Sequence, residues 1–256
     1  MKLAIFQPDA RRSERSPLQA LEAALREQTG QGFDLVLCPE LFVSGYGNAD
    51  TIRRLASPTD GELVENLAAL AREHEVAIAC GYPEKEGECL YNSALCLSSR
   101  GDLLANHRKR VLPMAYEKEL FEKGSRMTVF DLDNGWRAAL LVCYEVEFPE
   151  AVRACTLEGA QLILVPTALG RDWQVVSRQL IPTRAFENGV FIAYANFAGE
   201  DEAGGYLGDS VIVSPTGQEL ARAGEKQALI GAELDMQAIA SARTRLPYLA
   251  DYPDVC

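Results

Sequence analysis

The chain has 256 residues, of which 48% are hydrophobic and 24% charged, a composition that suits one large globular domain or at most two small ones. The 37 acidic and 25 basic residues give a formal net charge of −12, so the surface repels phosphate backbones and nucleic-acid binding is not expected. The apolar run before Gln7 is too short for a signal-peptide core, and no segment approaches membrane-spanning length. We therefore expect a soluble cytoplasmic protein.

Seven cysteines are spread along the chain: Cys38, Cys80, Cys89, Cys96, Cys143, Cys155 and Cys256. Their odd number and the lack of a Cys-x-x-Cys pair argue against a disulfide framework or a zinc site. Most of them lie in apolar, strand-like runs, where a free cysteine is usually a small buried hydrophobic residue. This interpretation applies to every cysteine unless other residues argue for chemistry.

Apolar runs and periodic apolar positions predict strands and helices along the first half of the chain. In chain order, these are strand 2–6, helix 16–28, strand 33–38, helix 61–75, strands 76–82, 91–97 and 103–110, and helix 116–123. Ser16 and Gln19 form a capping-box pattern at the start of the first helix, which is expected to end at about Gln28.

The second half continues the alternation. In chain order, the predicted elements are strands 129–132 and 136–142, helix 150–157, strand 162–166, helix 173–188, and strands 190–195, 211–213, 218–221 and 229–234. Pro182 is expected to kink or divide the 173–188 helix. Residues 199–208 are expected to form a loop, and the tail from Thr244 has too little pattern for a prediction.

Buried β-α-β units therefore alternate with hairpins along the chain. This mixture predicts an α/β fold with mixed sheets rather than a purely parallel, doubly wound sheet. The chain shows no internal repeat, low-complexity segment or linker, which predicts a single domain over residues 1–256.

Three apolar strands are followed by residues that can carry chemistry: Glu40, Lys109 and Cys143. Loops at strand ends can reach into one crevice, where α/β proteins often build their sites. A carboxylate can act as general base toward the thiol, and an ammonium can favour the thiolate and stabilise an oxyanion. The pattern alone leaves open that Glu40 is a cap, that Lys109 lies on the surface and that Cys143 is a core residue.

Three segments around these residues resemble the motifs of the nitrilase superfamily of carbon–nitrogen hydrolases. The segment 37–46 (LCPELFVSGY) resembles its Pro-Glu-x-x-x-x-Gly-Tyr pattern, and 107–112 (HRKRVL) is similar to its Tyr-Arg-Lys-x-x-Leu pattern. The segment 141–150 (LVCYEVEFPE) looks like its Cys-Tyr-Asp-x-x-Phe-Pro-Glu pattern. Further similar segments extend the resemblance over nearly the whole chain: 91–94, 164–168, 184–188, 208–210 and 215–217.

The resemblance implies a four-layer α-β-β-α sandwich with two mixed β-sheets, which assembles as a homodimer or a larger homo-oligomer. It also implies Glu40 as general base, Lys109 as oxyanion stabiliser and Cys143 as nucleophile. The backbone N–H of Tyr144 would be a second oxyanion donor. Glu117 matches the register of another active-site glutamate of the family, with an ordinary helix charge as the equally weighted alternative.

The chain departs from the family patterns at positions beside the three catalytic ones. Cys38 stands where phenylalanine is usual, His107 replaces tyrosine, Val111 replaces histidine and Glu145 replaces aspartate. These departures bear on the shape of the pocket, and so weaken the substrate assignment more than the mechanism.

The expected reaction is hydrolysis of a small amide through a thioester, with no metal or organic cofactor. Tyr144 after the nucleophile favours an amidase or N-carbamoyl hydrolase over a nitrilase, and an ω-amidase is a further alternative. The residues expected to bind substrate are Tyr46, Thr167, Ala168 and Trp173, with core packing as the alternative for Trp173. Arg171 is a candidate for holding a substrate carboxylate, although a surface arginine is the simpler interpretation.

Two rival interpretations come from other classes. A papain-like enzyme would pair Cys143 with a histidine, but only His74 and His107 exist. His107 would share a strand face with Lys109, and His74 is expected to be solvated. A non-catalytic binding or scaffold protein on the same fold is the second rival, and the presence of Glu40, Lys109 and Cys143 together argues against it.

Overall fold

The apolar strands pair into two six-stranded sheets, which are described here from a computed structural model that covers residues 1–11, 16–27, 30–202 and 204–254. The strands of the first sheet are, in spatial order, β14 (Ala228–Glu233), β1 (Lys2–Gln7), β2 (Leu35–Leu37), β3 (Ala77–Glu86), β4 (Cys89–Leu97) and β5 (Leu103–Arg108). The central strands β1, β2 and β3 are parallel, whereas β14, β4 and β5 join by antiparallel pairing.

The second sheet repeats this mixture. In spatial order it contains β13 (Glu219–Arg222), β12 (Val211–Val213), β9 (Phe191–Ala195), β8 (Leu162–Pro166), β7 (Arg137–Leu140) and β6 (Thr128–Asp131). The strands β7, β8 and β9 are parallel, and the outer pairs are antiparallel. The predicted mixed sheets are therefore confirmed.

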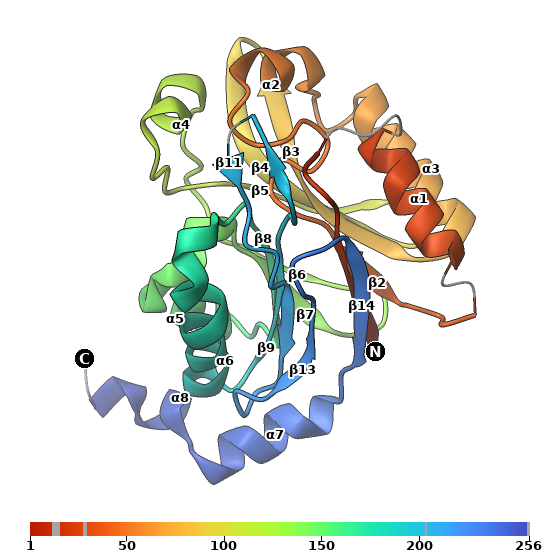
Figure 1. Cartoon of the computed structure of the whole chain (residues 1–256). Coiled ribbons are helices and arrows are strands. Elements are labelled where there is room, and N and C mark those ends of the chain that lie inside the picture. The colour runs from red at the N-terminus through yellow and green to blue at the C-terminus, as the bar shows by residue number, and fades with distance from the viewer. Residues whose placement is uncertain (12–15, 28–29, 203, 255–256) are drawn as a thin grey trace.

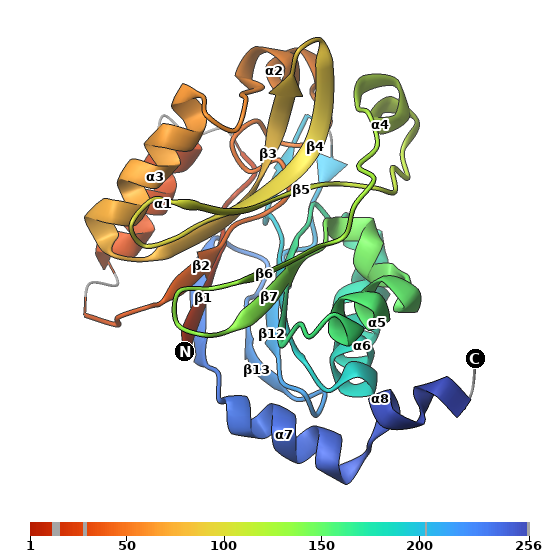
Figure 2. The same ribbon diagram turned by 180° about the vertical axis from the view of Figure 1, so that it is seen from behind.

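The sheets pack face to face and are covered by helices on both outer faces (Figures 1 and 2). Between the sheets, Leu3 and Leu37 of the first share a core with Leu140 and Leu164 of the second. A separate apolar core lies under α1 (Pro17–Glu27) and α3 (Glu62–His74), and another under α5 (Pro149–Leu157) and α6 (Ile181–Asn188). The parallel strands at the centre of each sheet are therefore buried on both faces, by the other sheet on one side and by helices on the other. This arrangement confirms the predicted four-layer α-β-β-α sandwich.

The first helix begins as the sequence predicts. The backbone N–H of Gln19 donates to Ser16 Oγ at 3.3 Å, and the backbone N–H of Ser16 donates to Gln19 Oε1 at 2.9 Å. This reciprocal pair satisfies two N–H groups that the helix itself leaves without partners. The predicted helix end at Gln28 and the seventh cysteine, Cys256, lie outside the described residues.

Three helices lack the regular spacing of apolar residues that would predict a helix from the sequence. They are α2 (Ala49–Leu55), α7 (Met236–Arg245) and α8 (Tyr248–Asp251). Each buries one side chain or none, so it has no apolar stripe from which it could be predicted. For α2 and α7, the residue that caps the start of the helix indicates the helix better than its apolar residues do. Asn48 and Asp235 accept hydrogen bonds from backbone N–H groups of the first turn. Figure 1 places α7 at the opposite end of the sandwich from α2.

The region predicted as one helix over 173–188 is divided. A 3₁₀ turn at Arg171–Trp173 precedes a π-helical turn at Val176–Leu180, and Pro182 lies in the first turn of α6. The remaining elements are α4 (Ala115–Leu120), the short strands β10 (Glu200–Asp201) and β11 (Gly204–Gly205) in the predicted loop, and 3₁₀ turns at Cys143–Glu147 and Tyr252–Asp254. None of the helices in the described part of the chain has both the length and the apolar character needed to cross a membrane.

Candidate active site

Glu40 follows β2 directly and is held against the neighbouring strand. The backbone N–H of Gly81 on β3 donates to Pro39 O at 2.9 Å, and that of Phe42 donates to Gly81 O at 2.9 Å. A Cβ at Gly81 would lie 2.5 Å from both Glu40 Cα and the backbone nitrogen of Leu41, so only glycine permits this approach. The Glu40 side chain is completely buried.

Lys109, which follows β5, lies between two buried carboxylates. Its Nζ is 2.7 Å from Glu40 Oε1 and 2.7 Å from Glu117 Oε1, and all three side chains are fully buried. The amide of Asn92 on β4 donates to the same two oxygens, at 2.7 Å and 3.2 Å. Since β5 runs parallel to β2, the carboxyl ends of both strands meet at one edge of the sheet and bring these residues together.

Cys143 lies just beyond β7, as the first residue of the 3₁₀ turn that leads into α5. Its φ of 49° is in the left-handed region, which costs a residue with a side chain on the order of 1–3 kcal/mol and persists only where neighbours fix it. Thr167 Oγ1 donates to the sulfur at 2.9 Å and also lies 3.1 Å from the hydroxyl of Tyr194. The backbone N–H of Glu40 donates to Thr167 O at 3.3 Å, which joins the two sheets at the site.

Burial and the neighbouring charges both shift the pKa values of Cys143 and Lys109. Burial raises the pKa of Cys143 and the charge of Glu40 adds to the rise, while Lys109, the Thr167 hydroxyl and the Ala168 N–H oppose it. Burial by itself lowers the pKa of Lys109, but the charges of Glu40, Cys143 and Glu117 outweigh it, so the pKa of Lys109 is raised. Burial also raises the pKa of Glu117, against the charge of Lys109.

Tyr46 and Tyr116 form part of the wall beside the carboxylates. Their rings meet edge to face with centroids 5.3 Å apart. Burial raises the pKa of Tyr46 and the charges of Glu40 and Glu117 raise it further, so its hydroxyl lies within electrostatic reach of both acids. Tyr46 also lines an open groove of about 920 Å³. Ala168 is half-buried, and its N–H faces the Cys143 sulfur.

Trp173 and Arg171 lie farther out. The Trp173 side chain is 61% exposed, so the alternative that it packs in the core is wrong. The guanidinium of Arg171 is 3.6 Å from Glu200 and donates to Gly199 O at 3.3 Å, which ties it to the β10–β11 hairpin.

Neither histidine contacts Cys143. The two ring nitrogens of His107 face Glu145 at 2.9 Å and Thr128 at 3.1 Å, which weighs against the papain-like alternative. His74 lies in the outer helix layer and is half-buried rather than fully solvated as predicted.

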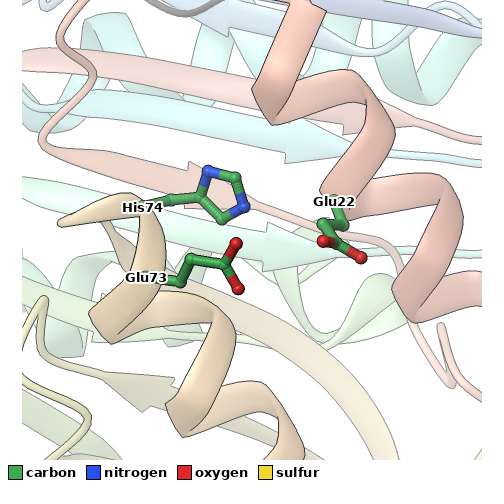
Figure 3. Close-up of side chains that lie close together, drawn as sticks. All are labelled: Glu22, Glu73 and His74. Carbon is green, nitrogen blue, oxygen red and sulfur yellow. The ribbon is translucent and has the colours of Figure 1, made fainter.

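His74 belongs to one cluster whose residue types could hold a metal ion. It meets Glu73 of its own helix, α3, and Glu22 of α1 (Figure 3). The guanidinium of Arg26 contacts both carboxylates, at 3.0 Å from Glu73 and in a closer pair with Glu22. Because the Arg26 guanidinium already pairs with both carboxylates, the cluster does not make a convincing metal site.

Asn92 and Tyr194 were not predicted as site residues. Asn92 is a fully buried amide within an apolar strand, and buried polar groups nearly always have partners. That burial pattern is a usable signal, because only a neighbouring polar site could satisfy the amide. Tyr194 carries no such signal, since a tyrosine in a strand is ordinary core.

Comparison with known proteins decides the family. Residues 2–244 match the carbon–nitrogen hydrolase family. This chain belongs to that family. It is 37% identical over 256 residues to a protein of Pseudomonas protegens described as a hydrolase in the pqqF 5′ region, with 98% of this chain and 88% of that one covered. It is 31% identical to an (R)-stereoselective amidase of Pseudomonas sp, with coverage of 85% and 79%.

Solved structures of the family share the fold. An amidase from Nesterenkonia sp. AN1, with acrylamide added at its active site cysteine, superimposes with a TM-score of 0.81 at 34% identity. The match covers 96% of this chain and 98% of that structure. The predicted class, a cysteine-dependent carbon–nitrogen hydrolase of the amidase type within the nitrilase superfamily, is confirmed.

Proposed function

We propose that this carbon–nitrogen hydrolase cleaves small amides, with Cys143 as nucleophile, Glu40 as general base and Lys109 as oxyanion stabiliser. One observation carries the assignment: the Lys109 ammonium lies 2.7 Å from the Glu40 carboxylate, in full burial, and both charges act on the Cys143 thiol. A buried ammonium and carboxylate beside a thiol supply the cation and base that thioester chemistry needs.

The first half of the reaction forms a thioester. Glu40 Oε1 accepts from Lys109 and Asn92, whereas Oε2 is buried and has no partner among the described residues. Oε2 is therefore the oxygen that takes the proton of Cys143 as the sulfur attacks the amide carbon. Lys109 stabilises the negative charge on the carbonyl oxygen. The Tyr144 N–H, in the first turn of the 3₁₀ segment where N–H groups lack helical partners, supplies a second donor.

The second half releases the acid. The carbon–nitrogen bond breaks as the amine or ammonia takes the proton from Glu40. A water molecule then gives a proton to Glu40 and attacks the thioester carbon. The carbon–sulfur bond breaks as the acid forms, and the Cys143 sulfur regains its proton from Glu40. Glu117 holds Lys109 in place from the other side at 2.7 Å, which supports its role in positioning rather than as a surface charge.

The substrate is proposed as a neutral, small amide. Tyr46, Thr167 and Ala168 line the site, and relatives named as amidases support an amide over a nitrile. Arg171 is bound to the β10–β11 hairpin, so it gives no support for a carbamoyl substrate with a carboxylate. Ammonia release from a panel of primary amides, N-carbamoyl compounds and nitriles tests this: primary amides should be the best substrates, and faster turnover of either other class would contradict it.

A non-catalytic scaffold is the alternative from another class. Wild-type protein that releases no ammonia from any panel member, with a Cys143 no more reactive than the exposed Cys89, would favour it.

We also propose one catalytic domain over residues 1–256 and a homodimer in the cytoplasm. The family match over 2–244 and the shared inter-sheet core support the single domain. Half-exposed Phe148, Leu157 and Phe186 on or beside α5 and α6 leave apolar surface for a second copy. Light scattering should give twice the mass of the chain, and a monomer at micromolar concentration would contradict the dimer.

A further inference from the structure

Glu145 is a buried carboxylate that the proposed reaction does not use. It lies two residues after Cys143 in the 3₁₀ turn, and it is 1% exposed. Oε2 accepts from the backbone N–H of Val142 at 2.7 Å and faces His107 Nε2 at 2.9 Å. Oε1 accepts from the backbone N–H of Arg110 at 3.0 Å and from its Nε at 3.3 Å.

These partners flank the two proposed catalytic residues. Val142 immediately precedes Cys143, whereas His107 and Arg110 lie two residues before and one residue after Lys109. One carboxylate therefore joins the backbone beside the nucleophile to the backbone beside the cation, although the two residues follow strands of different sheets. Cys143 keeps a left-handed φ of 49°, a conformation that needs such fixing from its neighbours.

The network requires an ionised acid. A carboxylate offers about four lone-pair positions, and here four N–H donors point at it. Burial acts to raise the pKa of Glu145, but the hydrogen bond and charge of His107 and the N–H groups of Val142 and Arg110 hold it below its usual range. Glutamine would turn an NH₂ group toward some of these donors.

His107 and Glu145 are also two of the positions at which the chain departs from the family patterns, which have tyrosine and aspartate there. The structure places the two departures in contact, at 2.9 Å. Histidine is shorter than tyrosine, which has a larger ring and a hydroxyl, whereas glutamate is longer than aspartate by one methylene. The two changes therefore compensate in length, and Nε2 must carry the hydrogen because a carboxylate only accepts.

We propose that Glu145, paired with His107, is a positioning residue that holds the Cys143 sulfur and the Lys109 ammonium in the relative place that attack requires. This inference rests on the proposed roles of Cys143 and Lys109. A displacement of about 1 Å between reacting groups can reduce a rate on the order of 100-fold, so a small loss of register is measurable.

The experiment measures alkylation of Cys143 by iodoacetamide with peptide mass spectrometry, which needs no turnover. The exposed Cys89 in the same molecule is the internal reference. Glu145→Gln should slow Cys143 alkylation by about 10- to 100-fold while Cys89 is unchanged. With a primary amide, kcat should fall by a similar factor while KM stays within about twofold, because only the reacting groups have moved.

Glu84→Gln is the matched control. Glu84 is likewise buried, at 2% exposure, with four donors from Arg108, Ser93 and Asn106, but it does not bond to the Cys143 turn. It should lower the melting temperature as Glu145→Gln does and leave Cys143 alkylation unchanged. An equal loss of Cys143 alkylation rate in both variants would show that general destabilisation causes the loss, and would overturn the proposal.

A length series covers the case in which Glu145→Gln does not fold. Glu145→Asp should slow Cys143 alkylation, and the double variant H107Y/E145D should recover at least about tenfold of that loss. Unchanged alkylation in Glu145→Asp, or no recovery in the double variant, would overturn the pairing. If the wild-type protein releases no ammonia from any primary amide, the proposed function fails instead, so the two failures are distinguishable.

Discussion

Lys109 Nζ lies 2.7 Å from Glu40 Oε1, and neither side chain has access to solvent. The same ammonium faces Glu117 at 2.7 Å, so one buried cation serves two buried acids. Such a cluster is costly to desolvate and is held by geometry and by the hydrogen bonds around it. Its members therefore respond to substitution more strongly than surface ion pairs do.

Lys109→Met leaves two buried carboxylates without their cation. The free energy of unfolding should fall by about 3–5 kcal/mol, because an uncompensated buried charge remains. Loss of the oxyanion donor should reduce kcat by about 100-fold or more. Urea unfolding and ammonia release check the two effects. Lys118→Met, at an exposed lysine of α4, should change neither quantity, and wild-type kcat in Lys109→Met would contradict the assignment.

Glu117→Gln keeps an acceptor near Lys109 but removes the charge. Since that charge helps to raise the pKa of Lys109, the pKa of Lys109 should fall toward its ordinary value in the variant. We expect kcat to fall by about 10- to 100-fold at neutral pH with the fold intact. Glu119→Gln, at an exposed position of the same helix, is the control. Equal activity in both variants would return Glu117 to the status of an ordinary helix charge.

Gly81→Ala tests the close approach that positions Glu40. The new Cβ would lie 2.5 Å from backbone atoms of Glu40 and Leu41, so the segment carrying the base must shift. We expect a loss of about 1–3 kcal/mol in the free energy of unfolding, together with reduced kcat. Gly224→Ala, where a Cβ meets nothing within 4 Å, should have little effect on either. Full activity in Gly81→Ala would show that this approach is not needed.

Thr167→Val removes the hydroxyl that donates to the sulfur at 2.9 Å. This hydrogen bond favours the thiolate, so its loss should raise the pKa of Cys143 further above its ordinary value. The pH profile of Cys143 alkylation should therefore move to higher pH. Thr183→Val is the control, because the Thr183 hydroxyl donates to Gln179 O in the preceding π-helical turn rather than to the sulfur. A profile that stays in place, or moves to lower pH, would contradict the role of Thr167.

The layers of the fold could be predicted because their signals are local. Apolar runs in the sequence predict the buried strands. Apolar stripes predict α1 and α3, and the capping box at Ser16 also predicts the start of α1. The helix α7 could not be predicted from periodicity, since Ile239 is its one buried residue. Pro182 predicts a break in the 173–188 helix, but the sequence does not predict the π-helical turn at Val176–Leu180 just before it.

The site was predictable only as far as its motifs reach. Glu40, Lys109 and Cys143 follow strands, and their residue types suggest chemistry, but spacing along the chain says nothing of a 2.7 Å contact between Glu40 and Lys109. The partners of Glu145 illustrate the same limit. Its sequence position suggests a peripheral departure from a motif, whereas three of its four hydrogen bonds, those from His107 and Arg110, exist only once the two sheets have packed.

The central claim is that Cys143 carries the acyl group. Rapid quenching during turnover of the best primary amide in the substrate panel, followed by intact-mass and peptide mass spectrometry, is the sharpest test. We expect a mass increase equal to the acyl group, confined to the peptide that contains Cys143. In Cys143→Ala, both this mass increase and turnover should be lost. Turnover that survives in Cys143→Ala, or an acyl group found on another residue, would contradict it.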